Sequence, residues 1–250
     1  ALNALGALAG AVGAWGAERV GMLERWSRFR ANWLAPDARG ALVLLAVWPF
    51  ALLFPSAVPL GLGQVAERVE LWLADLLSDT PWLEWLPLRE AELQPLLPLA
   101  ELVCVASGLL VPCLLGYSVI LRVWQRFAFW LAVLATALAV SALSTALSFG
   151  PEFAWEWLAL PVRVGLVLGA VAALPMLLAP RAACLALALA ALVLGLVLLN
   201  QAPEGPYFAQ TLQTWEQGRF VRFHGLAQWL GWLWPYAALL YVVLRLSRPR

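Results

Sequence analysis

Long apolar runs alternate with short polar segments along most of the chain. Seven runs have the roughly 17 to 25 residues that a helix with a rise of about 1.5 Å per residue needs to cross a bilayer. They lie at residues 1–17, 41–62, 98–121, 127–149, 162–179, 182–199 and 225–246. Isolated strands would leave backbone groups unpaired in lipid, and no alternation typical of barrel strands recurs. The expected fold is therefore all-α, a polytopic membrane bundle of about seven transmembrane helices plus interfacial helices.

One predicted interfacial helix lies in the acidic connection 63–97. Apolar residues recur there at the i, i+3, i+4 and i+7 spacing of one helical face: Val69, Trp72, Leu73 and Leu76. Pro81 ends this pattern, which predicts a helix on the outer surface. The proline-punctuated stretch that follows is expected to place Trp82, Trp85 and Leu88 in the membrane interface.

A second interfacial helix is predicted after the first run. Trp26, Phe29 and Trp33 are spaced i, i+3 and i+7, with arginines between them. This pattern predicts a helix lying against an anionic leaflet. Two interpretations stay open: an orientation signal with an aromatic belt, or a dedicated site for a lipid or a partner.

The second run is interrupted by Pro49, Pro55 and Pro59. Each proline removes a backbone donor and crowds the carbonyl four residues earlier, so the outer half is not expected to continue as a helix. A helix over 41–54 would span only about 21 Å. The remainder is either a broken segment near a cavity, shielded by neighbouring helices, or the end of an ordinary proline-terminated helix.

Composition supports a membrane protein. Hydrophobic residues make up 63% of the chain and charged residues 12%, whereas soluble domains carry roughly 25% charged residues. Soluble enzymes are therefore excluded, and the net charge of +1 indicates no strong attraction to nucleic acid. Cys104, Cys113 and Cys184 lie in apolar runs, which favours apolar packing over a disulfide framework or zinc binding. No cofactor or metal is expected.

The arginines divide the connections into two sides. Eleven of the sixteen arginines fall on one side of the predicted spans, and twelve of the fifteen acidic residues fall on the other. Basic residues concentrate in cytoplasmic loops. The sequence therefore predicts a multi-pass protein whose carboxyl terminus is cytoplasmic and whose first residues lie outside.

The candidate site is the stretch EQGRFVRFHG, just before the last run. Arg219, Arg222 and His224 are predicted on the outer side, against the usual distribution of arginine. Guanidinium groups match phosphate oxygens bidentately and an imidazole can donate as well, which predicts binding of an anionic lipid headgroup. Glu216 lies close enough in sequence to neutralise Arg219, so anchoring or internal ion pairing stays open. Catalysis by His224 is a third interpretation, although no catalytic motif accompanies it.

Small and hydroxylated residues indicate packing faces. Gly6 and Gly10 have the GxxxG spacing that lets helices approach closely, the alternative being a groove for a ligand chain. In the fourth run, hydroxyl groups lie along one side near the outer end: Ser141, Ser144, Thr145 and Ser148. Such hydroxyls usually bond to their own helix or to a neighbour, and this interpretation is favoured over a functional one.

The first run contains LNALGALAG, with Asn3, Gly6 and Gly10. It resembles the closing helix of the VanZ-like family of bacterial membrane proteins, where a segment of the form D-x-x-x-N-x-x-G-x-x-x-G is typical. The region from RWSRFR through LLFPSAVPLGLGQV to YFAQTLQTWEQGRFVRFHGLAQWLGWLWPY is similar to the extra carboxyl-terminal part of longer proteobacterial members. The resemblance implies that most of a VanZ-like domain, including the family's acidic position, precedes Ala1. Only Asn3, Gly6 and Gly10 carry over, as helix-packing residues.

That family is associated with the cell envelope and with teicoplanin resistance. The expected organisation is the last helix of a VanZ-like region and a cytoplasmic interfacial helix in 1–40, followed by a membrane domain of about six spans in 41–250. The expected function is that of a non-enzymatic protein of the bacterial inner membrane, which engages an anionic lipid or cell-wall precursor at its outer face. Its expected partners are membrane lipids, including a phosphate-bearing envelope lipid. The alternatives are a transporter or enzyme acting on lipid-linked substrates, and a membrane scaffold.

Overall fold

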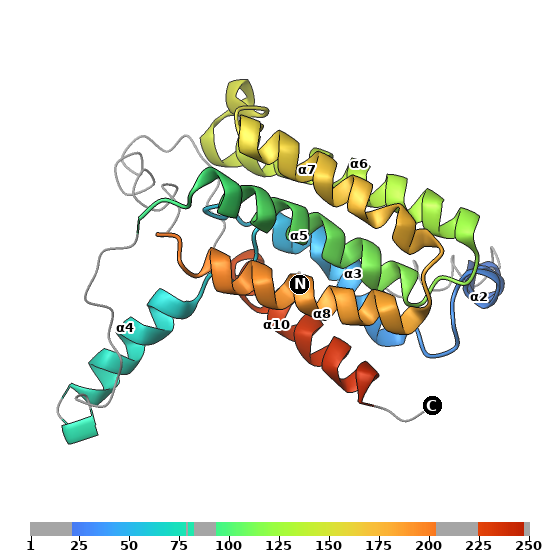
Figure 1. Cartoon of the computed structure of the whole chain (residues 1–250), viewed down its shortest axis with the longest axis horizontal. Coiled ribbons are helices and arrows are strands. Elements are labelled where there is room, and N and C mark those ends of the chain that lie inside the picture. Colours follow the sequence, from blue (N-terminus) through green and yellow to red (C-terminus); the bar gives the residue numbers. More distant parts are fainter. Residues whose placement is uncertain (1–21, 79, 83–93, 204–224, 248–250) are drawn as a thin grey trace, which may run out of the picture.

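The helices of the structure match most of the predicted runs. The computed structural model describes residues 22–78, 80–82, 94–203 and 225–247, and this part of the chain is helical without β-strands (Figure 1). Within it, five helical segments are long and apolar enough to cross a membrane. They are α5 (Pro98–Tyr117), α6 (Val123–Phe149), α7 (Leu160–Ala173) with its 3-10 extension η3 (Pro175–Leu177), α8 (Arg181–Leu199) and α10 (Leu226–Leu246).

These segments correspond to the last five predicted runs, so the helical membrane bundle is confirmed to that extent. The first predicted run lies outside the described residues, and with it lie Asn3, Gly6 and Gly10. The total of seven spans therefore stays a prediction.

The central helix of the bundle is α5. It packs along both α7 and α8, and it also contacts α3 (Arg39–Leu52) and α6 (Figure 1). A Cβ atom added to Gly165 or Gly169 of α7 would lie 2.7 or 2.8 Å from a backbone carbonyl oxygen of α5, at Leu102 and Ala106 respectively. The close α5–α7 contact therefore requires a residue without a side chain at both positions.

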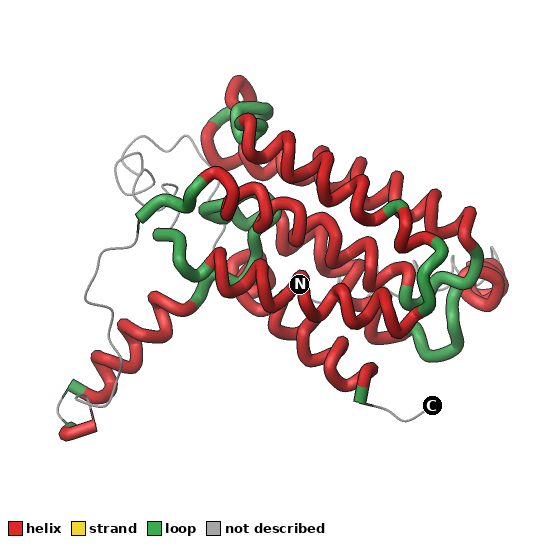
Figure 2. The backbone as a smooth tube through the Cα atoms, viewed as in Figure 1, coloured by secondary structure: helices red, strands yellow, loops and turns green. Residues whose placement is uncertain are grey.

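The chain crosses the bundle in alternating directions, so its connections gather at two ends (Figure 2). One end contains α2 (Met22–Trp33), the start of α3, and the connections α5–α6 and η3–α8; we call it the arginine end. Leu34 and Ile120 form an antiparallel bridge there, beside a hydrogen bond of 2.8 Å from Ala35 N to Val119 O. The other end contains the segment after α3, the α6–α7 connection and the end of α8; we call it the break end.

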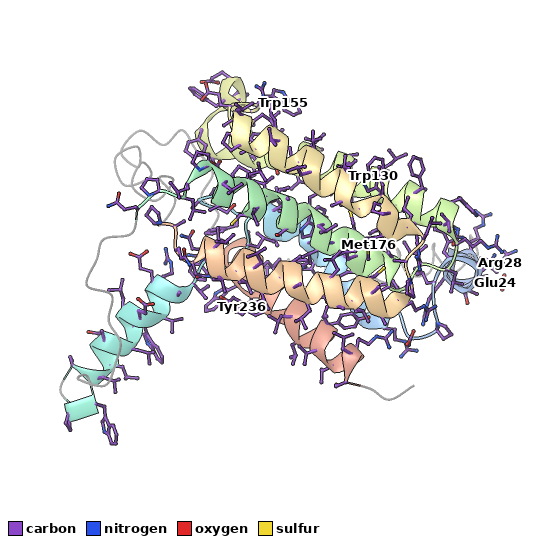
Figure 3. All side chains as sticks on the ribbon, viewed as in Figure 1. Glu24, Arg28, Trp130, Trp155, Met176 and Tyr236 are labelled. Atoms are coloured by element: carbon purple, nitrogen blue, oxygen red, sulfur yellow. The ribbon has the colours of Figure 1, made fainter. Side chains whose placement is uncertain are left out.

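Charge is segregated between these two ends. Figure 3 shows Glu24 and Arg28 at the arginine end and Trp155 at the break end. The described arginines at the arginine end are Arg25, Arg28, Arg30, Arg39, Arg122, Arg126, Arg181 and Arg245. Those at the break end are Arg68 and Arg163, together with the acids Glu67, Glu70, Asp75, Glu101, Glu152 and Glu156. The described residues thus reproduce the two-sided distribution expected from the sequence.

Both predicted interfacial helices are present as helices. The helix predicted after the first run is α2. The ring of its Trp33 packs edge-to-face on Trp124 of α6, with centroids 5.1 Å apart. The helix predicted in the acidic connection is α4 (Ala66–Leu77). It ends before Pro81 as predicted and points away from the bundle (Figure 1). Trp72 on its apolar face is 61% exposed. Trp85 and Leu88 lie outside the described residues.

The second predicted run is broken. Its helical part, α3, ends at Leu52, and the following segment 53–65 is irregular. Four apolar side chains of this segment are nevertheless buried among the helices, with exposures of 9% or less: Phe54, Val58, Leu60 and Leu62. Of the two alternatives for the second run, the structure therefore shows the broken segment shielded by neighbouring helices. Such shielding is required because irregular backbone facing lipid would leave polar groups unpaired.

The packing roles predicted for hydroxyls and cysteines are confirmed. Ser144 Oγ donates to Leu53 O of the broken segment at 2.9 Å, and Thr145 Oγ1 donates to Ser141 O on its own helix at 3.0 Å. Ser148 Oγ similarly donates to Ser144 O at 2.7 Å. The three cysteines carry free thiols and are buried in the apolar core.

Candidate ligand crevice at the break end

The residues of the sequence-predicted headgroup site lie outside the described residues: Glu216, Arg219, Arg222 and His224. The described chain resumes at Gly225, directly after them in the sequence, and α10 begins at the break end. The polar geometry described at this end is built by segment 53–65, α4, α8 and α10.

The backbone of the broken segment is unusual at two positions. Leu60 has a φ of 61°, and Gly63 has a φ of 93°. A residue other than glycine in this region costs on the order of 1–3 kcal/mol and persists only where the surroundings enforce it. Leu60 is 3% exposed, and a Cβ atom on Gly108 of α5 would lie 2.5 Å from Leu60 O. The glycine of α5 therefore makes room for the strained turn.

Asn200, at the end of α8, holds the end of the broken segment by hydrogen bonds. Its Oδ1 accepts hydrogen bonds from the backbone N–H groups of Val65 and Ala66, at 3.0 and 2.9 Å. An asparagine oxygen commonly satisfies the first N–H groups of its own helix. Here Asn200 supplies that cap to α4 from another helix. Its Nδ2 donates to Gly63 O at 3.2 Å and to Leu196 O at 2.8 Å.

Further hydrogen bonds tie this segment to α10 and to the residues after α8. Tyr236 of α10, labelled in Figure 3, donates its hydroxyl to Gly63 O at 3.0 Å. Gly63 N donates to Gly231 O of α10 at 2.9 Å. Gln64 Nε2 donates to Ala202 O and Pro203 O, at 2.7 and 2.9 Å, just after α8. The N–H and carbonyl groups of Gly63 are thus paired inside the protein, as membrane depth requires.

A crevice of about 20 Å³ lies beside the broken segment. Its lining includes polar side chains from the segment and from α4, namely Ser56, Gln64 and Arg68. The Arg68 guanidinium carbon lies 4.6 Å from the centroid of the Trp232 ring of α10. Trp232 itself packs edge-to-face against Phe54 and Trp229, with centroids 6.0 and 5.7 Å away. Stacking on an aromatic face orients a guanidinium group while its N–H donors project around its edge.

A second cavity, of about 40 Å³, is lined mainly by buried residues of the bundle. Its lining includes Trp48 of α3, Ser107 of α5 and Gly195 of α8. Gly61 and Leu62 line both this cavity and the crevice, so the broken segment separates the two spaces.

The chemistry that this arrangement offers is recognition of a small anionic group. The crevice holds an oriented cation beside aromatic rings, and phosphate oxygens are the acceptors that guanidinium groups match best. Within the described ranges, no group of three His, Cys, Asp or Glu side chains is placed to hold a metal ion.

Sequence reasoning missed the residues that shape the crevice. In the sequence, Arg68 is one of several arginines in the polar connections, and Trp232 and Tyr236 are two of several aromatic residues in the last run. Asn200 has a signal in the sequence, because it and Gln201 are amides that directly follow a wholly apolar run. Its partners lie more than 130 residues earlier in the chain, which no local pattern reveals.

Comparison of the chain with protein-family models, with curated proteins and with solved structures found no match.

Proposed function

We propose that this chain belongs to a multi-pass protein of the bacterial inner membrane that binds an anionic envelope lipid or a lipid-linked cell-wall precursor, without catalysing a reaction. The observation that carries the proposal is the Arg68 guanidinium, which stacks on Trp232 beside a crevice where the second span is broken. The resemblance of the first run to the VanZ-like family supports a role in the envelope. The excess of arginine at the opposite end supports an outward-facing break end and a cytoplasmic carboxyl terminus.

The size of the crevice limits how a ligand is held. A volume of about 20 Å³ accommodates roughly one water-sized group. One phosphate oxygen therefore enters beside Arg68, while the rest of the headgroup stays outside the crevice. Trp229 and Trp232 have apolar rings with one polar edge, which suits the depth at which a headgroup meets its hydrocarbon chains.

Recognition at this end is local. Acidic side chains outnumber arginines among the described residues of the break end, so the overall field there does not attract an anion. Exposed charges are screened beyond about 8 Å at physiological ionic strength. Binding then depends on direct hydrogen bonds from Arg68, and we propose that Arg219, Arg222 and His224 add donors to the same ligand while Glu216 offsets one charge.

The experiment is native mass spectrometry of the protein in phosphatidylcholine nanodiscs loaded with an isoprenyl phosphate. Hydrogen bonds to charged groups contribute about 1.5–3 kcal/mol, so Arg68→Gln is expected to reduce retention of the phosphate roughly 10- to 100-fold. Arg163→Gln is the matched control, because Arg163 is an exposed arginine of the same end whose Nε donates to Leu158 O at 2.6 Å. Equal retention by the two variants contradicts the proposal.

A second candidate function is transport of a lipid-linked substrate. The observation that favours it is the second cavity, which shares Gly61 and Leu62 of its lining with the crevice. Proteoliposomes with a labelled isoprenyl phosphate in one leaflet distinguish the two functions. Protein-dependent movement to the other leaflet would establish transport, whereas retention without movement supports binding alone. Turnover of the lipid that is lost on substitution of His224 would instead indicate an enzyme.

A further inference from the structure

Trp48 carries a buried hydrogen-bond donor without a partner. Its side chain is 2% exposed, and its indole Nε1 has no acceptor among the described residues. Trp234, which lines the same cavity from α10, donates its Nε1 to Leu44 O at 2.8 Å. A buried N–H group left unpaired is costly, and the cost is greatest where no bulk water is near. The two tryptophans therefore differ in a way that needs an explanation.

The cavity beside Trp48 is large enough to supply the missing partner. A water molecule needs roughly 10–15 Å³ of this kind of volume, so a cavity of about 40 Å³ accommodates about two or three. Ser107 also lines the cavity and adds a hydroxyl group that can both donate and accept. A water between these side chains has the minimum of two polar partners that buried water requires.

The position of the cavity also favours water. It lies against Leu60, Gly61 and Leu62, the irregular part of the second span. Non-helical backbone at membrane depth is found where it is buried in protein or lines a water-filled space. The crevice, which also includes Gly61 and Leu62 in its lining, carries the polar side chains of Ser56, Gln64 and Arg68.

We propose that this cavity is a hydration site, in which ordered water accepts a hydrogen bond from Trp48 Nε1 and bonds to Ser107 Oγ. The site holds these two polar groups in an otherwise apolar lining and shares Gly61 and Leu62 with the crevice. It is a property of the protein without ligand, so it stands whether or not a lipid binds at Arg68.

Gly195→Ala tests the proposal, because the added methyl group occupies the space of the water without a clash. A Cβ atom at Gly195 would lie 3.4 Å from Ser107 Cβ and 4.0 Å from Ser107 Oγ, which are ordinary contact distances. In a dry cavity the methyl group fills empty space and raises the Tm. In a hydrated cavity it displaces the water and strands the Trp48 N–H, which lowers the Tm.

The decisive measurement is the Tm of four purified full-length proteins: wild type, Gly195→Ala, Trp48→Phe and the double variant. We expect Gly195→Ala to lower the Tm of the wild type but not that of Trp48→Phe, where no N–H needs the water. A shift of the same sign and size in both backgrounds overturns the proposal. An equal rise would mean a dry cavity, and an equal fall would mean a steric effect unrelated to water.

A second measurement requires no substitution at Trp48. In protein labelled with 15N at the indole nitrogens, magnetisation transfer from water to Trp48 Nε1 is expected in NMR spectra. Trp234 is the internal control, because its N–H is bonded to Leu44 O and not to water. Transfer to neither indole overturns the proposal.

Discussion

Replacement of Arg126 by alanine is predicted to destabilise the arginine end. Arg126 lies in the first turn of α6 and is 8% exposed, and no carboxylate of the described residues pairs with it. Its Nε donates to Ile120 O at 3.2 Å, and its Nη1 donates to Leu177 O and Ala179 O at 2.9 Å. Ile120 follows the end of α5 and Leu177 ends η3. The guanidinium therefore satisfies carbonyl groups in two connections, one after α5 and one at the end of η3.

These hydrogen bonds determine how much Arg126→Ala is expected to lower the free energy of unfolding. A hydrogen bond to a charged group contributes about 1.5–3 kcal/mol, but contributions from one side chain do not add fully. Leu177 and Ala179 are half-buried, so water can replace part of the hydrogen bonding that Arg126 gives to their carbonyl oxygens. We expect Arg126→Ala to lower the free energy of unfolding by about 3–5 kcal/mol. Arg126→Lys keeps the charge but loses the planar fork, and about half of that loss is expected.

The assay is titration of the purified protein with SDS, followed by circular dichroism. Arg39→Ala is the matched control, since Arg39 is an exposed arginine at the same end and begins α3. Removal of a cation at a helix N-terminus should change the free energy of unfolding by less than about 0.5 kcal/mol. If Arg126→Ala costs no more than Arg39→Ala, the carbonyl groups do not depend on the guanidinium and the reasoning is wrong.

Four further substitutions probe the break end and the junction of α10 with the α2–α3 connection. Asn200→Ala removes the cap of α4 and a donor to Gly63 O, so the free energy of unfolding should fall by about 2 kcal/mol and cleavage within α4 by protease should accelerate. Gly63→Ala should cost more than about 2 kcal/mol, because its Cβ would lie 2.5 Å from Pro235 Cγ at a φ of 93°. Gly225→Ala, with a φ of 72° but no neighbouring atom within 4 Å, should cost only about 1 kcal/mol in the same denaturation assay. The hydrogen bond from Arg245 holds the pKa of the Asp37 carboxyl below its usual value. The pair contributes under about 1 kcal/mol to the free energy of unfolding, because it is exposed. This contribution is present above the unfolded pKa of roughly 3.9 and is lost as the pH falls through the lower folded pKa. Asp37→Asn should therefore remove this part of the decrease in Tm at acidic pH.

The membrane helices were predictable because lipid leaves the backbone few choices. In the described part of the chain, every long apolar run after the second became a helix, since only a helix pairs its own backbone groups within one segment. The spacing of Val69, Trp72 and Leu76 predicted α4 in the same way, from one element alone.

The interior of the break end was not predictable from local patterns. Pro49, Pro55 and Pro59 indicated that the second run is broken, but they did not show that the remainder folds back into the bundle. That path depends on Asn200, Gly108 and Gly231, which contact the segment from three different helices. Arg126 illustrates the same limit. In the sequence it stands in the short polar segment between the third and fourth runs, whereas the structure buries its guanidinium among the carbonyl groups of Ile120 and Leu177.

The direction in which the break end faces decides whether the crevice meets an envelope ligand. Single-cysteine variants labelled with a membrane-impermeant maleimide in intact cells measure it, and the native cysteines are buried. Glu152→Cys at the break end is expected to react in intact cells, and Arg28→Cys at the arginine end only after permeabilisation. The reverse pattern would place Arg68 and its crevice on the cytoplasmic side and contradict the proposed function.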